Sequence, residues 1–218
     1  MLKNLVTIAF RNILKEKGYS LINLLGLSIG ITCSLFLTLY VLDELSYDKY
    51  HKNAENIYRV VSNIKEPDNA FTWAVAQIPL ADELRDNHAE ITNAVRFFGT
   101  GRTLYTYEDK SFNEEAFYLA DSTVFEMFSY KFLQGDKETA LDNPYSIVLT
   151  ESMAIKYFGS ADCLDKALTD PENDQYKITG IIEDVPDNSH FSFDALISRN
   201  SAPSYQGSWG NFGVFTYV

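Results

Sequence analysis

The residues best suited to chemistry lie close together near the end of the chain. Ser189, His190 and Asp194 supply a hydroxyl, an imidazole and a carboxylate, the groups that serine hydrolases use for nucleophilic catalysis. A catalytic triad is defined by its geometry in the folded protein, and adjacency along the chain does not provide that geometry. We therefore interpret this segment as a polar turn and predict that the chain is not an enzyme.

No other group of residues forms a recognisable catalytic or metal centre. The adjacent carboxylates Glu114 and Glu115 are typical of a solvated surface rather than of an acid and base pair. The three histidines are scattered, and Cys33 and Cys163 lack neighbouring ligands, so neither a zinc site nor a disulfide framework is expected. Motifs of P-loop ATPases, dinucleotide-binding proteins, zinc proteases and α/β-hydrolases are absent from the sequence. We expect no cofactor in this chain.

The net negative charge argues against nucleic acid as a partner. The charged residues also divide the chain into three parts. The 218 residues include 18 Lys and Arg against 30 Asp and Glu, and the net charge of −12 would repel the phosphates of nucleic acids. Residues 1–20 carry four basic residues against Glu16 alone, and residues 21–42 carry no charge. The other 14 basic and 29 acidic residues therefore fall in 43–218. The basic residues of the first part are Lys3, Arg11, Lys15 and Lys17.

The uncharged run 21–42 predicts a transmembrane helix. Its 22 residues would span about 33 Å as a helix, enough to cross a bilayer. The cores of signal peptides are shorter and end in a small-residue cleavage site, and core helices seldom need so long an uncharged run. The positive-inside rule then places residues 1–20 in the cytoplasm and 43–218 outside the cytoplasmic membrane.

Small residues recur every four positions along this predicted span. Gly26, Gly30, Ser34 and Thr38 would lie on one face of the helix, where another helix could approach closely. The alternative is that Gly and Ser are simply common in membrane helices. Four positions in register favour a packing face.

Residues 1–20 predict an amphipathic helix in the cytoplasmic membrane surface, with the basic side chains anchoring it to lipid headgroups. Gly18 and Ser20 predict a bend before the span. A disordered basic flank is the alternative interpretation. The apolar positions at helical spacing are Leu2, Leu5, Val6, Ala9 and Ile13.

Short strands alternate with helices after the span, which predicts a mixed α+β domain over 43–218. Helices are expected over 75–90, after a cap at Asp121 or Ser122, and from Thr150 to a stop at Gly159. The expected strands are 57–64, 95–98, 104–107, 116–120, 146–149, 176–183 and 191–197, with a returning strand at the end of the chain.

Three stretches of this sequence resemble MacB/FtsX-type ABC transporter permeases that carry a MacB-like periplasmic core domain. The most specific pieces are the pattern R-N-x-x-K-x-K-G-Y-S-x-I-N-x-x-G-L-x-x-G from Arg11 to Gly30, and D-V-P-x-N-S-H from Asp184 to His190. Between them, YSIVLTESMAIKYFGSADCLDKAL resembles a strand and helix unit of that domain. The resemblance covers essentially the whole chain.

The resemblance implies a permease with four transmembrane helices and a large outer domain between the first two. Such permeases form dimers and pair with a separate cytoplasmic ATPase, which binds the ATP. Drugs, peptides or lipoproteins are handled outside the inner membrane, where other periplasmic or outer-membrane components can take part.

Two departures from the family pattern affect this expectation. Relatives commonly have Pro-x-Gly-Lys where this chain reads Cys163, Leu164, Asp165 and Lys166, so the shape of that loop is an open question. The sequence also stops at Val218, which is expected to be the end of a fragment or of a truncated gene product. Sequence beyond it should contain about three more apolar runs of about 20 residues. The alternative is a single-pass anchored binding module without an ATPase; an anchored hydrolase is a third hypothesis.

Overall fold

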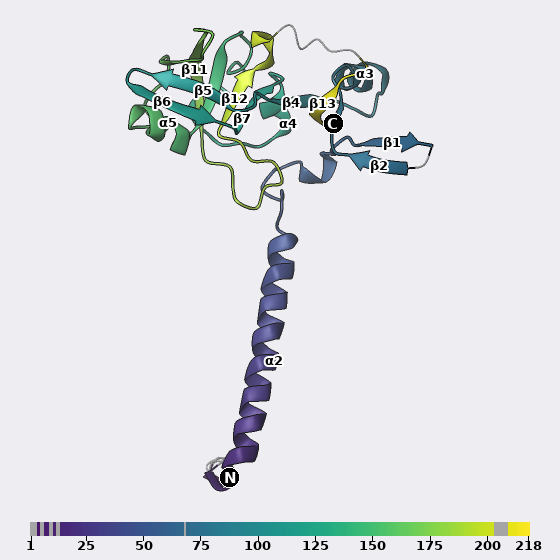
Figure 1. The fold of residues 1–218 in the computed structure, drawn as a ribbon, viewed down its shortest axis with the longest axis vertical. Helices are drawn as coiled ribbons and strands as arrows, with labels where there is room; N and C mark the ends of the chain where they lie inside the picture. The colour runs from purple at the N-terminus through teal and green to yellow at the C-terminus, as the bar shows by residue number, and fades with distance from the viewer. Residues whose placement is uncertain (1–3, 5–6, 9–10, 12–13, 68, 203–208) are drawn as a thin grey trace. The chain divides into compact units, whose positions relative to one another are not determined.

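The structure is a computed structural model that describes residues 4, 7–8, 11, 14–67, 69–202 and 209–218. The chain divides into two compact units, Met1–Tyr47 and Asp48–Val218 (Figure 1). The first unit contains the long helix α2, and the second contains the sheets.

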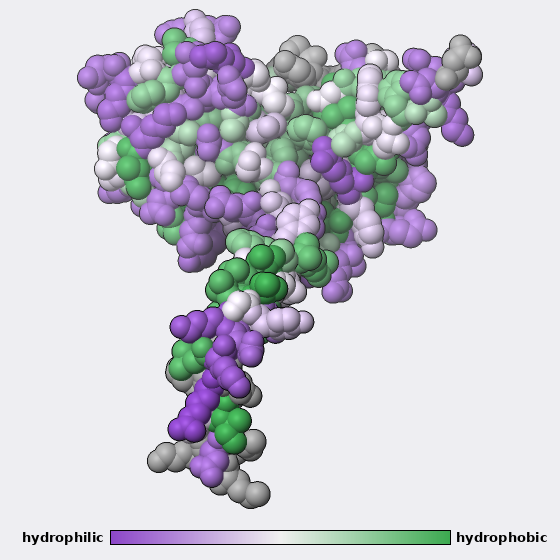
Figure 2. Space-filling model, turned by 60° about the horizontal axis from the view of Figure 1, so that its bottom comes forward, coloured by the Kyte–Doolittle hydropathy of each residue, from purple (hydrophilic) through white to green (hydrophobic). Residues whose placement is uncertain are grey.

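Helix α2 (Lys17–Glu44) includes the whole predicted span. Its 28 residues reach about 42 Å, and among the described residues it is the one helix long and apolar enough to cross a membrane. None of its side chains is buried, and the face of the helix visible in Figure 2 carries hydrophobic side chains, with hydrophilic ones toward the N-terminal end. An apolar surface of this extent needs lipid or another helix to cover it.

The bend before this helix lies at Glu16, and the prediction that Gly18 and Ser20 would mark it was wrong. Both residues are inside α2, because the amide of Ser20 already donates to the carbonyl of Glu16 at 2.9 Å. Regular i→i−4 bonds outweigh the small helix-propensity cost of Gly and Ser. The described residues 4, 7, 8, 11, 14 and 15 are helical, whereas the apolar positions on which the amphipathic helix was predicted lie outside the described residues.

The second unit is an α+β domain, which confirms the predicted fold class. Its helices are α3 (Leu80–Asn87), α4 (Val124–Met127) and α5 (Glu151–Phe158), with short 3-10 helices η1 (Ala54–Asn56) and η2 (Arg199–Ser201). Its strands are β1 (Ser62–Glu66), β2 (Asn69–Trp73), β3 (Ala76–Gln77), β4 (Val95–Gly99), β5 (Thr103–Tyr107), β6 (Lys110–Glu114), β7 (Phe117–Ala120), β8 (Phe132–Gly135), β9 (Ser146–Thr150), β10 (Ala167–Thr169), β11 (Gln175–Ile182), β12 (Ala195–Ser198) and β13 (Phe212–Tyr217).

Among the described residues, eleven strands form one mixed sheet, and β1 and β2 form a separate antiparallel hairpin. The main sheet has the order β3-β13-β4-β7-β12-β9-β11-β10-β5-β6. One edge of β11 pairs with β9 in parallel. Its other edge pairs antiparallel with β10 along the first half of β11 and antiparallel with β8 along the second half. Figure 1 shows the β5–β6 hairpin and α5 at one end of the domain and the β1–β2 hairpin at the other.

The hydrophobic core lies on both faces of this sheet. Along β9 the side chains of Ile147 and Leu149 join one buried cluster, and that of Val148 joins the other, because successive residues of a strand point to opposite faces. Helix α5 covers the first cluster and α4 the second. Every residue of β9 and β12 is buried, which places the middle of the sheet away from water.

Local signals predicted some element ends correctly. The side chain of Thr150 accepts a hydrogen bond from the amide of Met153 at the start of α5, and Gly159 ends that helix in the left-handed conformation, with φ of 76°. For α4 the predicted caps were wrong, since Thr123 takes the N-cap position. The carboxylate of Asp121 binds Arg96 instead.

Three other elements are shifted or shorter than predicted. Strand β1 begins at Ser62 rather than at residue 57, and α3 begins only at Leu80, because Ala76 and Gln77 pair with β13 instead. Strand β12 begins at Ala195 rather than at residue 191. For β1 and α3 a pairing with the distant strand β13 replaced the local pattern, whereas Phe191 forms local hydrogen bonds with Ser189 instead of extending β12.

Two features of the backbone explain particular residue choices. A Cβ atom on Gly180 would lie 2.7 Å from Cε1 of Phe132, so the approach of β8 to β11 requires glycine there. Asp165 has a φ of 65°. Its amide donates to the carbonyl of Ile178, so this aspartate occupies a left-handed turn that favours glycine.

Candidate functional site at the start of the folded domain

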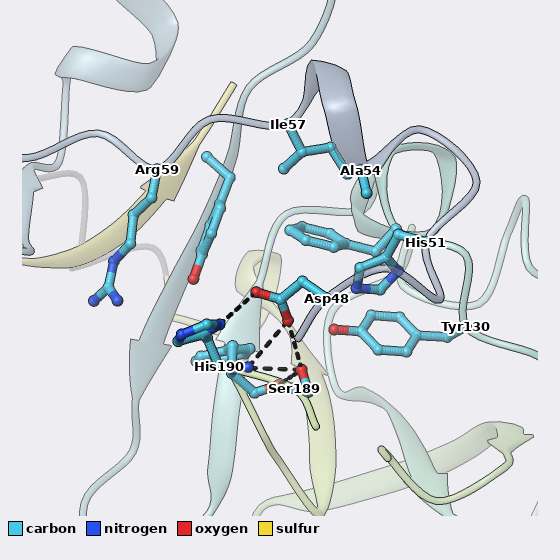
Figure 3. A pocket seen from close by; sticks show the side chains of 11 residues that line it. Asp48, His51, Ala54, Ile57, Arg59, Tyr130, Ser189 and His190 are labelled. Atoms are coloured by element: carbon cyan, nitrogen blue, oxygen red, sulfur yellow. Dashed lines mark hydrogen bonds and ion pairs between the residues drawn. The ribbon is translucent and has the colours of Figure 1, made fainter. Parts of the chain in front are cut away.

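The first residues of the α+β domain line a cavity. This cavity has a volume of about 230 Å³ and is lined by residues 48–59, by the turn at 128–130, by residues 189–191 and by Tyr217. Figure 3 shows the carboxylate of Asp48 directed at Ser189 and His190, with the ring of His51 beside that of Tyr130. Asp48 is four residues beyond the end of α2, so the site is covalently next to the predicted span.

Asp48 holds the loop that ends the D-V-P-x-N-S-H motif. Its Oδ2 lies 2.8 Å from Nδ1 of His190, and its Oδ1 accepts hydrogen bonds from the His190 amide at 3.0 Å and from the Ser189 hydroxyl at 3.3 Å. The Asp48 amide donates to the carbonyl of Asn188 at 3.0 Å. We call Asp48, Asn188, Ser189 and His190 the Asp48 clamp. The backbone of Asp48 is left-handed, with φ of 57°, a conformation that Asp tolerates better than most residues.

The clamp does not have the order of a catalytic triad. In a triad the imidazole lies between the carboxylate and the serine hydroxyl. Here the hydroxyl of Ser189 and Nδ1 of His190 share the carboxylate of Asp48. Asp194, which a triad would need as its third member, lies near Glu114 instead. The pKa of Asp194 is raised, mainly by burial and secondly by the negative charge of Glu114. These contacts agree with the interpretation of Ser189 and His190 as part of a polar turn.

A second attachment lies three residues further along the chain. Nδ1 of the buried His51 accepts a hydrogen bond from the amide of Ser129 at 3.1 Å, and the amide of Lys52 donates to the Ser129 hydroxyl at 3.0 Å. We call these residues the His51 seat. The imidazole packs edge-on against Phe128 and Tyr130, with ring centroids 5.0 and 5.3 Å away. Burial lowers the pKa of His51, and the nearby Asp48 carboxylate opposes this effect.

A third attachment joins the same segment to the last strand. The amide of Tyr58 donates to the carbonyl of Val218 at 2.8 Å, and that of Val60 donates to Thr216 at 2.9 Å. Arg59 lies between them, and its guanidinium is 4.8 Å from the ring centroid of Phe215. Residues 48–60, which we call the leading segment, are therefore fastened to the domain at three places.

The motif loop connects the Asp48 clamp to the centre of the domain. At its start, Oδ1 of Asp184 accepts a hydrogen bond from the amide of Ser152, in the first turn of α5. At its end, Ser189 and His190 bind Asp48. Because the loop joins β11 to β12, the clamp reaches two central strands and one helix.

Sequence reasoning found one half of this site and missed the other. It singled out the motif from Asp184 to His190 but assigned Asp48 to no site. The signal that could have found it is its position, because it lies in the first turn after α2 and within the stretch that resembles the family.

The residues predicted for membrane packing share one groove on α2. Gly26, Gly30, Ser34 and Thr38 line it together with neighbouring apolar residues, and the volume of the groove is about 420 Å³. The Thr38 hydroxyl donates to the carbonyl of Ser34 at 2.8 Å, so its polar atom is satisfied within the helix. The role of this groove in helix packing remains a prediction.

The predicted membrane-anchoring residues are described in part. Arg11, Lys15 and Lys17 are helical and exposed, and Lys3 lies outside the described residues. Anchoring by these four side chains remains a prediction. Among the described residues, no group of three His, Cys, Asp or Glu side chains could hold a metal ion.

A separate charged cluster has a structural role. The guanidinium of Arg96 on β4 is 3% exposed and binds Asp121 at 2.8 Å and Asp82 at 2.7 Å, and it also donates to the carbonyl of Ile78 at 3.0 Å. Buried charges of this kind are stable only when they are paired and hydrogen-bonded. The cluster therefore joins β4, α3 and the turn before α4.

The fold and the site together define a class of membrane-anchored protein. Its α+β domain begins with the leading segment, which comes directly after an apolar helix of membrane-spanning length. The model of the MacB-like periplasmic core domain matches residues 20–218, and the chain belongs to this family. The resemblance identified from the sequence is confirmed. This is a family of transporter permease domains and not a catalytic one.

Solved structures share the fold at low sequence identity. A domain assigned to a permease protein from Porphyromonas gingivalis matches with a TM-score of 0.64 and 24% identity, over 75% of this chain and 74% of that chain. The periplasmic region of MacB from Actinobacillus actinomycetemcomitans matches with a TM-score of 0.52 and 16% identity, over 76% and 77%. The extracellular domain of the ABC-type transporter YknZ from Gram-positive bacteria matches with a TM-score of 0.54 and 11% identity, over 74% and 82%. A comparison with curated proteins finds no match.

Proposed function

We propose that this chain is the N-terminal part of the membrane subunit of an ABC transporter. In this proposal a separate cytoplasmic ATPase binds ATP and moves the membrane helices, and the α+β domain handles substrates for export outside the inner membrane. Drugs, peptides and lipoproteins are the candidate substrate classes. The observation that carries the proposal is the family membership of a domain that begins four residues after a helix of membrane-spanning length.

Charge supports the proposed orientation. The flank before α2 is basic, and residues 43–218 carry more than twice as many acidic as basic residues. Basic flanks remain on the cytoplasmic side of a membrane, so the α+β domain would face the periplasm. The basic side chains would also hold the first residues at the anionic membrane surface.

The Asp48 clamp supports the proposed mechanical role. A displacement of α2 acts on the leading segment, and the clamp passes it to the loop between β11 and β12. Asp184 then connects that loop to α5. A chain of hydrogen bonds to two central strands, of which β12 is buried throughout, transmits force better than a mobile linker does.

The groove on α2 supports a partner within the membrane. Small residues let backbones approach closely, and no side chain of α2 is buried in the described chain. A second permease copy or another span of the same subunit would cover it. Other periplasmic or outer-membrane components are further candidate partners of the α+β domain.

Two measurements test the proposal. The downstream gene sequence should encode about three further apolar runs of about 20 residues, and the full-length protein should co-purify with a nucleotide-binding subunit. Asp48→Gly should then lower substrate-stimulated ATP hydrolysis severalfold while the complex still assembles. Asp165→Asn, which also alters an exposed ion pair, is the matched control and should leave that stimulation unchanged. A stop codon after residue 218 with no co-purifying ATPase would instead support the single-pass binding module.

A further inference from the structure

We propose that the His51 seat is a pH-sensitive switch, which on acidification releases the middle of the leading segment from the turn at 128–130 while the Asp48 clamp stays closed. The switch is a property of the α+β domain alone. Its exposure to the pH of the external medium rests on the proposed function, which places this domain outside the inner membrane.

The geometry at His51 requires a neutral imidazole. Nδ1 accepts the hydrogen bond from the Ser129 amide, so the ring proton of the neutral form lies on Nε2. Protonation would place a second N–H on Nδ1, directed at the N–H of Ser129, and the hydrogen bond would become a repulsive contact. Since His51 is only 6% exposed, water cannot readily take the place of Ser129.

On balance the surroundings of the ring disfavour a positive charge on it, because burial outweighs the attraction of the Asp48 carboxylate. The nearest carboxylate is Asp48, which already accepts three hydrogen bonds in the clamp. The ring of Tyr50 is nearest, with its centroid 3.9 Å from that of the imidazole and tilted by 42°, and the rings of Phe128 and Tyr130 lie at 67° and 89°, so none of the three is stacked in parallel on the imidazole. The titratable and charged groups that face His51 or share its cavity are Asp48, Tyr50, Arg59, Tyr130, His190 and Tyr217.

The clamp does not depend on the His51 ring. The amides of Asp48 and His190 both take part in it, donating to the carbonyl of Asn188 and to the Asp48 carboxylate. Loss of the His51 seat three residues away therefore leaves this attachment in place. The leading segment would pivot about Asp48, and Lys52 would lose its bond to Ser129.

The direction of the pH dependence follows from the lowered pKa of His51. The unfolded chain takes up this proton near the ordinary value of 6.5, whereas the folded domain takes it up at lower pH. The unfolded or opened state thus binds more protons between these two values. The stability that the seat provides is present above about pH 6.5 and is lost as pH falls toward the folded value.

Hydrogen exchange of the full chain in lipid nanodiscs tests the switch without ATP or a partner. After correction for the intrinsic pH dependence of exchange, protection of the Ser129 and Lys52 amides should fall tenfold or more between pH 7.5 and pH 5.0. The His190 amide, which donates to Asp48, should stay protected. In the His51→Asn variant the acceptor is an amide oxygen that does not titrate. Protection of the Ser129 amide in this variant should therefore be independent of pH. His88→Asn, at an exposed histidine, should behave as the unmodified chain.

Two results would overturn the switch. One is equal protection of the Ser129 amide at both pH values, and the other is the same pH dependence in the His51→Asn variant. If that variant does not fold, NMR titration of the His51 ring in the unmodified chain decides, because a pKa at or above 6.5 contradicts the proposal. None of these measurements involves the ATPase, so a negative result leaves the proposed transporter function standing.

Discussion

Replacing Asp48 with three different residues separates the charge of the clamp from its hydrogen bonds and from its backbone conformation. Asn keeps an acceptor oxygen and tolerates the left-handed φ of 57°, so Asp48→Asn removes mainly the charge. Gly tolerates the same φ but has no side chain. Ala lacks the acceptor and is also strained at positive φ.

The structure sets the expected magnitudes. The contact with His190 joins side chains that are 42% and 61% exposed, so replacing the carboxylate by a neutral acceptor should lower the free energy of unfolding by only about 0.5–1 kcal/mol. Asp48→Gly loses three accepted hydrogen bonds, about 1.5–2 kcal/mol at this exposure. Asp48→Ala adds about 1 kcal/mol of backbone strain, for a total of about 2.5–3 kcal/mol.

The assay is urea unfolding of the full chain in detergent micelles, followed by near-ultraviolet circular dichroism of the aromatic core. Asp165→Asn is the matched control, because it alters an exposed ion pair with Lys177 at another left-handed residue. It should change the unfolding free energy by less than about 0.5 kcal/mol. The reasoning is refuted if Asp48→Ala is no more destabilising than Asp48→Asn, since the clamp would then hold nothing.

Three further predictions concern the interior of the domain and the span. Arg96→Met should lower the free energy of unfolding by about 1.5–3 kcal/mol, because Asp121 and Asp82 lose the buried guanidinium and keep only Arg199 and Arg85 as partners; a loss below about 0.5 kcal/mol in the same urea assay would contradict this. Gly180→Ala should cost about 1–3 kcal/mol through its clash with Phe132, whereas Gly99→Ala, whose Cβ would make an ordinary 3.6 Å contact, should cost less; equal losses would disprove the packing argument. Gly30→Ile should reduce cross-linking between copies in bilayers severalfold, while isoleucine on the opposite face of α2 should not.

Local sequence patterns predicted the elements that depend on near neighbours. The start and end of α5 followed from Thr150 and Gly159, since a cap forms with residues three or four positions away. The span followed from its length and from the charges that flank it. The prediction of β1 was displaced because residues 58–60 pair with the end of β13, more than 150 positions further along the chain.

The candidate site depends on contacts that no local pattern contains. The carboxylate of Asp48 and the imidazole of His190 are 142 positions apart, and they meet because the sheet brings the loop between β11 and β12 to the start of the domain. The same holds for Arg96, which lies in an apolar strand but is neutralised by carboxylates from α3 and from the turn before α4.

The amino-acid sequence alone determined that residues 21–42 form an apolar helix of membrane-spanning length with a basic flank, followed by an acidic α+β domain, because length, charge and periodicity are properties of consecutive residues. Only the tertiary structure decided which polar side chains meet. Hydrogen bonds and ion pairs reach about 3 Å, so a partner is set by the order of the strands and not by distance along the chain.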